Sequence, residues 1–418
     1  MAEQHGKALV PQIRFAGFTD PWEQRKLSST CEQLSRTINP LETPNEEFTE
    51  YSMPAFDNNE TAETVIGNSM NSLRKIVDRP CLLVNKLNVR KKRIWHVPRP
   101  EANAVCSSEF VPFSSHSSDL SFIKISLLSE RITAYLESCS SGSSNSQKRV
   151  TPEIIMSSEI IAPSLAEQRR IGAFFDRLDS LITLHQRKCD KLCVLKKSML
   201  DKMFPKGGSL YPEIRFAGFT DPWEQRKLGE LFEESDERAS DREILSVSVA
   251  NGIYPASESD RETNPGASLA NYKVVHSGDV VYNSMRMWQG AVDASRYDGI
   301  VSPAYVVAKP NSEVYARFFA RLLRQPMLLK QYQQVSQGNS KDTQVLKFDD
   351  FASIEISMPA SENEQRRIGA FFDRLDSLIT LHQRKYDGCA NPLFLERRIS
   401  CRKPSHQNRC SATTTPSG

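Results

Sequence analysis

A perfect internal repeat constrains this chain more than any other feature. The 22 residues EQRRIGAFFDRLDSLITLHQRK occupy 167–188 and return unchanged at 364–385. A second stretch, 13–27, recurs identically at 214–228. The offsets are 201 residues (214 − 13) and 197 residues (364 − 167), so the two halves differ little in length. Because identity over such stretches cannot arise by chance, the sequence predicts two copies of one structural unit.

The 22-residue repeat has the pattern of a long amphipathic helix. Its seam residues alternate steps of four and three from Ile171 through His185 to Met203, which is the heptad pattern of helices that pack together. Pro205 and Gly207 should end the first helix, which would then have about 38 residues and be roughly 57 Å long. The sequence therefore predicts that each half ends in a long helix and that the two helices form an antiparallel coiled coil.

Each expected helix begins with the same signal. Ser164 precedes Glu167 by three residues, and Ser361 stands in the same relation to Glu364. This spacing is a capping box, in which the serine side chain accepts from a helical N–H and the glutamate reaches back to the N–H of the capping residue.

The two copies diverge after the repeat. The first continues the heptad pattern, whereas Gly388 and Pro392 should end the second helix at Tyr386. The remaining residues, 387–418, have no periodicity and are rich in Ser, Thr, Pro, Arg and Cys. We therefore expect this tail to be disordered.

Composition allows a protein of several domains. The 418 residues are enough for two to four domains, and 39% hydrophobic residues are enough to form cores. The net charge of +3 names no partner. We expect neither a membrane span nor a secretion signal, because the sequence has no apolar run of the required length. Nine scattered cysteines fit a reduced, cytoplasmic protein, and Cys189 with Cys193 fits helix packing better than a metal site.

The regions between the repeats differ in sequence but share landmarks. In each, a buried-strand pattern ends in Asn, at Asn85 and at Asn283. Strand-like, helix-like and Gly-Ser segments follow in the same order, and a last strand, expected at 153–156 and 354–356, leads to the capped helix. This order predicts an α+β fold, with two similar mixed α/β globules joined by the two long helices.

Two features of these variable regions are candidates for binding nucleic acid. The run Arg90-Lys91-Lys92-Arg93, close to Trp95, offers charges that neutralise phosphates. The Gly-Ser loops at 142–148 and 338–344 offer groups that hydrogen-bond to phosphates or base edges. The alternatives are a solvated strand end for the run and ordinary surface loops for the other two segments. The candidate DNA-binding residues are Asn85, Lys86, Arg90, Lys91, Lys92, Arg93, Ser143, Asn145, Gln147, Lys148, Asn283, Arg286, Asn339, Ser340, Lys341 and Gln344.

The sequence shows no catalytic constellation. It lacks a Gly-rich phosphate loop ending in Lys-Ser/Thr, a paired-Cys zinc spacing and a His-Glu-x-x-His motif. The segments 20–22 and 391–394 each lack the second Pro of an amino-methyltransferase tetrapeptide. His185 and His382 lie on the helix seam, where we expect packing and no catalytic role. We expect neither catalytic residues nor metal ligands on this chain.

The two repeats together resemble the specificity subunits of type I restriction–modification systems. The resemblance is carried by FAGFTDPWEQRKL at 15–27 and 216–228, and by EQRRIGAFFDRLD at 167–179 and 364–376, in the order globule, helix, globule, helix. It covers about residues 11–386. It implies a non-catalytic subunit that recognises double-stranded DNA, with each target-recognition domain reading one half of a bipartite, asymmetric site.

The resemblance also implies partners and a domain plan. Two modification subunits would carry S-adenosylmethionine and methylate adenine, and restriction subunits would use ATP and magnesium to translocate and cut DNA. This chain itself would bind no cofactor. The implied segments are a first recognition domain at 1–163, a first long helix at 164–206, a second recognition domain at 207–360, a short second helix at 361–386 and the tail at 387–418. The helix-pair interface would comprise Phe175, Leu178 and Ile182 with Phe372, Leu375 and Ile379.

The short second helix departs from the family pattern. It ends about 15 residues earlier than the first helix does. A second hypothesis is therefore a truncated or recombined relative that folds but no longer assembles an active complex, and co-purification with modification subunits would distinguish it. A stand-alone methyltransferase is a third hypothesis, which cofactor binding by the purified chain would test.

Overall fold

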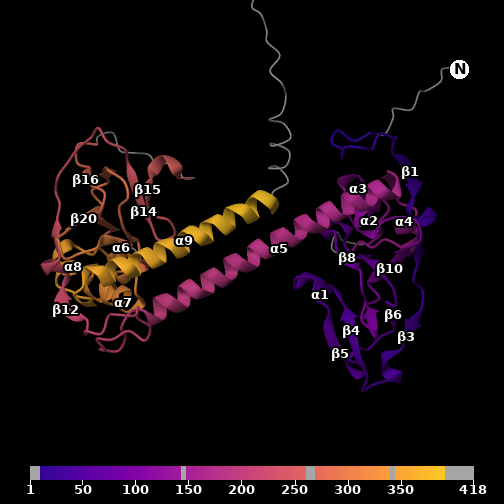
Figure 1. Cartoon of the computed structure of the whole chain (residues 1–418), viewed down its shortest axis with the longest axis horizontal. Helices are drawn as coiled ribbons and strands as arrows, with labels where there is room; N and C mark the ends of the chain where they lie inside the picture. The colour runs from indigo at the N-terminus through magenta and orange to yellow at the C-terminus, as the bar shows by residue number, and fades with distance from the viewer. Residues whose placement is uncertain (1–9, 143–146, 260–268, 339–343, 391–418) are drawn as a thin grey trace, which may run out of the picture. The chain divides into compact units, whose positions relative to one another are not determined.

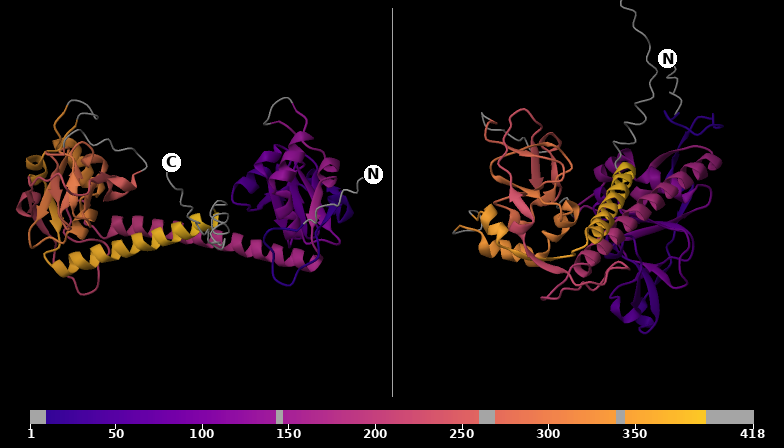
Figure 2. Two further views of the ribbon diagram at one scale, coloured as in Figure 1. Left: turned by 90° about the horizontal axis from the view of Figure 1, so that it is seen from above. Right: turned by 60° about the vertical axis from the view of Figure 1, so that its left-hand side comes forward.

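The computed structural model describes residues 10–142, 147–259, 269–338 and 344–390. The chain divides into two compact units, residues 1–181 and 182–418, here called unit 1 and unit 2. Each unit combines β-sheets with short helices, and long helices run from both (Figures 1 and 2), which confirms the expected α+β class. The tail beyond Ala390 lies outside the described residues.

Unit 1 contains two main sheets. The first has the strand order β2 (Cys31–Gln33), β10 (Phe110–Ser115), β7 (Cys81–Asn85) and β8 (Ile94–Val97). The second has the order β3 (Thr37–Ile38), β6 (Arg74–Ile76), β9 (Ala104–Cys106), β4 (Glu47–Tyr51) and β5 (Glu63–Ile66).

Strand β7 is buried on both of its faces, as its continuous apolar sequence predicted. Leu82 and Val84 face a core that includes side chains of α2 (Leu120–Leu127) and α3 (Glu130–Ser138). Cys81 and Leu83 face a second core on the other side. Successive side chains of a strand point to opposite faces, so this one strand lies between these two cores.

Unit 2 repeats the first sheet of unit 1. Its strand order is β13 (Phe232–Glu234), β20 (Tyr305–Pro310), β17 (Val280–Asn283) and β18 (Val292–Ala294). Two-stranded sheets formed by β14 (Leu245–Ser248) with β15 (Gly252–Pro255), and by β16 (Lys273–Val275) with β19 (Gly299–Val301), accompany it. Helices α6 (Ala316–Leu322) and α7 (Pro326–Val335) contribute Phe318, Phe319 and Tyr332 to its core.

The strand registers confirm that the two variable regions share landmarks. Asn85 at the end of β7 pairs with Phe110, and Asn283 at the end of β17 pairs with Tyr305. The chain therefore turns away from the sheet at the same position in both units, and the segment after each turn can be compared residue by residue.

The strand expected at 153–156 is wrong. Pro152–Met156 forms helix α4, which the Thr151 side chain caps. A short apolar run does not distinguish a strand from a helix, and a proline in the first turn favours a helix. The strand that leads to the long helix is β11 (Glu159–Ala162), and unit 2 has the same order, with α8 (Phe348–Ala352) before β21 (Glu355–Met358).

Residues of the repeats attach each long helix to its own unit. Arg14 donates two hydrogen bonds to the buried carboxylate of Glu167, at 2.7 and 2.6 Å, and Arg215 does the same to Glu364, at 2.7 Å each. Ser164 accepts from the Glu167 N–H at 3.5 Å, so only the serine half of this expected capping box forms. The predicted bond from the glutamate side chain back to the capping residue is wrong, because Arg14, from a distant segment, binds the Glu167 carboxylate.

Strand pairing completes this attachment. In unit 1, β1 (Glu23–Lys26) pairs antiparallel with β11, and in unit 2, β12 (Glu224–Lys227) pairs antiparallel with β21. Strands β1 and β12 have the identical sequence EQRK, whereas β11 and β21 differ in sequence and lie just before the repeated helix sequence, so both units attach the helix in the same way.

The two long helices differ in length. Helix α5 spans Leu165–Lys202, 38 residues, and ends before Pro205 as predicted. Helix α9 spans Glu362–Ala390, 29 residues, so the end expected at Tyr386 is wrong. Glycine costs about 1 kcal/mol relative to alanine inside a helix, which does not stop a helix that packing already holds.

Within unit 2, the last half of α5 packs antiparallel against α9 (Figures 1 and 2). His185 contacts His382, Lys196 pairs with Asp376, and Phe204, just beyond α5, stacks on Phe372 at 6.2 Å. The partner numbers fall along α9 as they rise along α5.

This register corrects the expected helix interface. Phe372 and Leu375 are buried against the end of α5, in a core that includes Met203 and Phe204, and Phe175 does not belong to that core. Phe175 lies against Phe174 at 5.3 Å in unit 1, and Leu178 and Ile182 are half-buried, as is Ile379. Equal positions of two antiparallel helices meet only at the centre of the pair, here at the two histidines.

Candidate nucleic-acid interface

The strand-end asparagines brace a turn in both units. The Leu87 N–H donates to Asn85 Oδ1 at 2.8 Å, and the Met285 N–H donates to Asn283 Oδ1 at 3.0 Å. A side-chain oxygen that accepts from the backbone two residues on is an Asx turn, which asparagine favours. Asn85 is buried and Asn283 half-buried, so both act first as turn residues and position the segment that follows.

In unit 1 the structure brings the Gly-Ser loop to this turn. The backbone of Ser141 and Arg149 is bonded in both directions, at 2.8 and 3.0 Å, which closes the loop between them. The Asn88 N–H donates to the carbonyl of Lys148 at 2.9 Å, and the Val150 N–H donates to that of Lys86 at 3.1 Å. Lys86 and Lys148, both half-buried, are therefore held on one local surface.

Gln147 is exposed next to Lys148, and Ser143 and Asn145 lie outside the described residues. Arg90, Lys91 and Lys148 line one shallow pocket together with Glu137. The pocket therefore joins the basic run to the Gly-Ser loop. The two segments were predicted from the sequence as separate candidates for binding nucleic acid.

The basic run is more strongly paired than its sequence indicated. Arg93 donates to both oxygens of Asp57, at 2.7 and 2.6 Å, and its side chain is only 9% exposed. This hydrogen-bonded pair lowers the pKa of Asp57 and raises that of Arg93. Arg93 is thus a structural residue that ties the strand end to α1 (Met53–Asp57), which corrects its assignment to DNA.

The other three cations of the run remain accessible. Arg90 pairs with Glu137, and Lys92 pairs with Glu130, both on α3. The side chains of Arg90 and Glu130 are 68% and 89% exposed, so both ion pairs are solvated. Solvated ion pairs contribute little free energy, so a phosphate can replace the carboxylate at small cost. Lys91 is exposed.

Unit 2 builds the same turn and loop from different side chains. Gln337 and Val345 are bonded in both directions, at 3.0 and 2.8 Å, and the Leu346 N–H donates to the Ser284 carbonyl at 2.9 Å. These contacts match those of Ser141, Arg149, Val150 and Lys86 at an offset of 196 to 198 residues (337 − 141 and 284 − 86).

The side chains on the turn after β17 are less basic than those on the turn after β7. Arg286 is exposed, whereas the next residue, Met287, is fully buried and Trp288 is half-buried. Gln344 donates to the Gln333 carbonyl at 3.4 Å. Asn339, Ser340 and Lys341 lie outside the described residues. One scaffold therefore presents two different surfaces.

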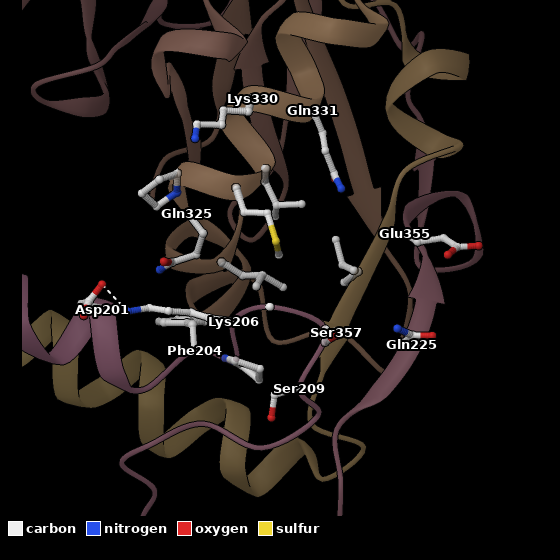
Figure 3. A pocket seen from close by; sticks show the side chains of 18 residues that line it. Asp201, Phe204, Lys206, Ser209, Gln225, Gln325, Lys330, Gln331, Glu355 and Ser357 are labelled. Carbon is white, nitrogen blue, oxygen red and sulfur yellow. Dashed lines mark ion pairs between the residues drawn. The ribbon is translucent and has the colours of Figure 1, made fainter.

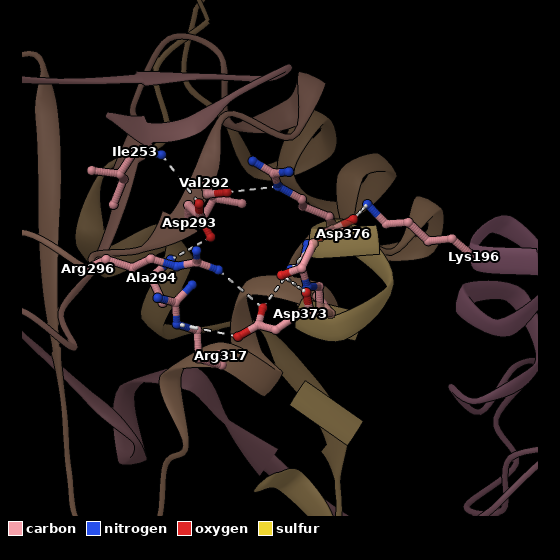
Figure 4. A network of polar contacts seen from close by, with 12 residues as sticks. Lys196, Ile253, Val292, Asp293, Ala294, Arg296, Arg317, Asp373 and Asp376 are labelled. Atoms are coloured by element: carbon pink, nitrogen blue, oxygen red, sulfur yellow. Dashed lines mark hydrogen bonds and ion pairs between the residues drawn. The ribbon is translucent and has the colours of Figure 1, made fainter. Parts of the chain in front are cut away.

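A group of arginines in unit 2 was not among the residues predicted from the sequence. Arg317, Arg321 and Arg324 follow one another at helical spacing on and just after α6, and Arg296 joins them beside Asp373 (Figure 4). Their spacing of four and three residues can be read in the sequence. The apolar residues between them, however, indicate a helix of the core.

A cavity lies in unit 2, next to the end of α5 (Figure 3). It has a volume of about 590 Å³, and Phe204, Lys206, Gln325, Met327 and Lys330 are among its lining residues. Lys206 pairs with Asp201 at its edge.

Two further findings concern the described part of the chain. It contains no group of three or more His, Cys, Asp or Glu side chains that could hold a metal ion. Among the same residues, no helix is long and apolar enough to cross a membrane.

Comparison with known families gives one matching family, whose model covers most of the chain. The model of the type I restriction modification DNA specificity domain matches twice, at residues 20–193 and 220–388. Each match contains one turn, one loop and the first part of one long helix.

Solved structures give matches along nearly the whole length. The S subunit of a type I restriction–modification system from M. genitalium is 13% identical, with a TM-score of 0.57, over 96% of this chain and 100% of that chain. The HsdS subunit from Thermoanaerobacter tengcongensis is 17% identical, with a TM-score of 0.42, over 92% of this chain and 97% of that chain. The first of these likenesses supports the fold described above.

Proposed function

Because this chain belongs to the family of type I restriction–modification DNA specificity subunits, we propose that each unit reads its own half of a bipartite DNA site. Recognition of DNA within a restriction–modification complex follows from membership of the family. The division of the site between the units, and the residues that make the contacts, are the substance of the proposal.

One observation carries the proposal. The turn after β7 and the turn after β17 share an Asx turn and a backbone hydrogen bond that joins each to its own Gly-Ser loop, yet their side chains differ. A scaffold that is kept while its exposed side chains change suits the reading of different base sequences, because base edges are distinguished by hydrogen-bonding side chains.

The accessible residues take distinct roles in this proposal. Arg90, Lys91 and Lys148 neutralise phosphates next to the unit 1 turn, and Gln147 contacts a base edge. In unit 2, Gln344 stands at the position of Lys148, and Arg286 lies on the turn after β17. Lys92 and Lys86 add charge to unit 1.

The chain would act without catalysis of its own. Two modification subunits would supply S-adenosylmethionine and methylate adenine in the site, and restriction subunits would supply ATP- and magnesium-dependent cleavage, in the cytoplasm. The repeated helices, which each unit holds through a buried Arg–Glu pair, are the constant part on which such partners would assemble.

Loop variants test the division of the site. Gln147→Ala and Gln344→Ala are each measured, in the complex with the modification subunits, against a duplex library randomised at every position of the site. Each variant should relax the preference at one half only, by roughly tenfold to a hundredfold for a lost bidentate contact. Lys26→Ala, on an exposed position of β1, is the matched control and should leave both halves unchanged.

Two outcomes would count against the proposal. A loop variant that alters both halves equally, or neither, would remove these loops from the readout. A chain that binds no modification subunit in co-purification would instead support the hypothesis of a relative that folds but no longer assembles.

A further inference from the structure

The repeated helix sequence uses the same aspartate differently in the two units. Asp176 of α5 accepts one hydrogen bond from the Ser121 hydroxyl, at 2.6 Å. Asp373, its counterpart on α9, lies beside three guanidinium groups, those of Arg321 at 3.0 Å, Arg296 at 3.5 Å and Arg317 at 3.9 Å (Figure 4). In unit 1 a single serine hydroxyl is enough as a partner for this aspartate. The three arginines beside Asp373 are therefore more than the fold requires at this position.

The equivalent positions in unit 1 carry no charge. Gly172 closely approaches Ser121, and Gly369, its counterpart, closely approaches Arg317, which places Ser121 and Arg317 at one position of the fold. Strand β8 aligns with β18 through the pairs Leu82 with His96 and Val280 with Ala294. Two residues further on, unit 1 has Pro98 where unit 2 has Arg296.

The cluster has more positive than negative charge. Asp376 accepts from Arg321 at 2.8 Å and from Lys196 at 2.5 Å. Arg324 donates to the Val292 carbonyl at 2.8 Å, next to the carboxylate of Asp293. Five cations (Lys196, Arg296, Arg317, Arg321 and Arg324) therefore face three carboxylates (Asp293, Asp373 and Asp376), an excess of two positive charges.

This excess is costly in the free protein. Burial lowers the pKa of Arg317, and the charge of Arg296 lowers it further. Burial also lowers the pKa of Arg324. Charges that are partly removed from water and incompletely paired destabilise a fold unless an anion compensates them. An anion bound at the cluster would remove part of this cost.

Two of the arginines can reach such an anion. The side chain of Arg296 is 55% exposed and that of Arg317 is 20% exposed, whereas Arg321 is held by two carboxylates. The planar guanidinium group matches the geometry of phosphate oxygens and donates to them in pairs.

We propose that Arg296 and Arg317 form a phosphate-binding site for the DNA backbone, which anchors unit 2 at positions where unit 1 has Pro98 and Ser121. This inference rests on the proposed function, because it takes the anion to be a DNA phosphate. The site positions the duplex and carries no base preference, since phosphate contacts are independent of sequence.

The test measures the salt dependence of DNA binding by the full chain. Arg296→Gln with Arg317→Gln is compared with the wild type on a fluorescent duplex of random sequence, across a series of salt concentrations. Loss of two phosphate contacts should reduce the slope of log K against log salt by about 1.8, at about 0.9 per contact. The matched control is Lys227→Gln with Lys309→Gln, which removes two exposed charges of unit 2 elsewhere and should leave the slope near that of the wild type.

A third variant works in the opposite direction. Asp373→Asn removes the carboxylate that competes for Arg296 and Arg317, so it should strengthen binding at low salt if these arginines bind phosphate. Thermal unfolding of each variant shows whether the chain remains folded.

The outcomes separate the two proposals. Equal slopes for the arginine variant and the lysine control, with a wild type that binds, would overturn the arginine site alone. A wild type without salt-dependent binding to any duplex would overturn the proposed function together with this site.

Discussion

His185 and His382, the same residue of the two repeats, face each other in unit 2 with their Nδ1 atoms 3.0 Å apart. Their ring centres are 5.2 Å apart. At this distance the N–H of one ring donates a hydrogen bond to the unprotonated nitrogen of the other. The contact lies at the centre of the antiparallel pair, where the two copies of the repeated sequence bring like residues together.

This contact should make unit 2 sensitive to acid. Partial burial lowers the pKa of His382, and the charges of His185, Lys188 and Lys385 lower it further. A histidine whose pKa is lower in the folded state holds fewer protons folded than unfolded, so stability falls as pH falls through the ordinary value of about 6.5. We therefore expect the Tm of the full chain to decrease from about pH 7.5 to about pH 5.5.

The variant His382→Gln should make that decrease smaller, because glutamine can still hydrogen-bond to His185 but does not titrate. His116→Gln, at an exposed histidine of unit 1, is the control and should leave the decrease unchanged. The interpretation fails if His382→Gln loses as much stability in acid as the wild type and the control.

The buried pair of Arg215 and Glu364 should contribute strongly to stability. Glu364 is 1% exposed and accepts two hydrogen bonds from the guanidinium group. Glu364→Gln should cost about 3 kcal/mol, because it leaves a largely buried arginine without its counter-charge. Glu362→Gln breaks only the exposed pair with Arg366 on the same helix and should cost less than about 1 kcal/mol. Equal denaturant midpoints for the two variants would contradict this account.

Gly369 should resist replacement even though it lies inside a helix. A Cβ atom there would meet Tyr315 Cε1 at 2.8 Å and Arg317 Cβ at 3.2 Å. Alanine gains about 1 kcal/mol of helix propensity, whereas overpacking costs about 1–3 kcal/mol. We expect Gly369→Ala to lower the free energy of unfolding, measured in urea. A stabilised variant would show that α6 moves away at little cost.

The basic run of unit 1 should divide into structural and DNA-binding residues. Arg93→Ala should destabilise the chain, because it leaves Asp57 without its partner and exposes the adjacent core. Lys91→Ala should leave the Tm unchanged and lower the salt slope of DNA binding by about 0.9. If Arg93→Ala alone changed the slope, with an unchanged Tm, the roles assigned to these two residues would be reversed.

The sequence predicted features that local patterns determine. The long helices, the buried strand at 81–85 and the match between Asn85 and Asn283 depend on periodicity and on comparison of the two halves. The same comparison located the turns and loops on which the proposed function depends.

Features set by distant segments were missed. The run at 90–93 does not show that Asp57, Glu130 and Glu137 approach it, because these residues come from separate elements. Glu167 fits a capping box as a local pattern, but it is 153 residues away from the arginine that binds it. The register of the helix pair likewise depends on where each helix is attached, which the heptad pattern does not encode.

The central claim is that each unit reads its own half of the site, and an exchange of variable regions tests it most directly. Residues 28–163 are replaced by a second copy of residues 229–360, so that both units carry the same surface on the unchanged repeats. The bases methylated by the complex with its modification subunits are then mapped across a genome. The account predicts a new site whose two halves carry the same base sequence, namely the half that unit 2 reads in the wild type. A site that keeps both original halves, or that shares neither half with the wild type, would contradict it.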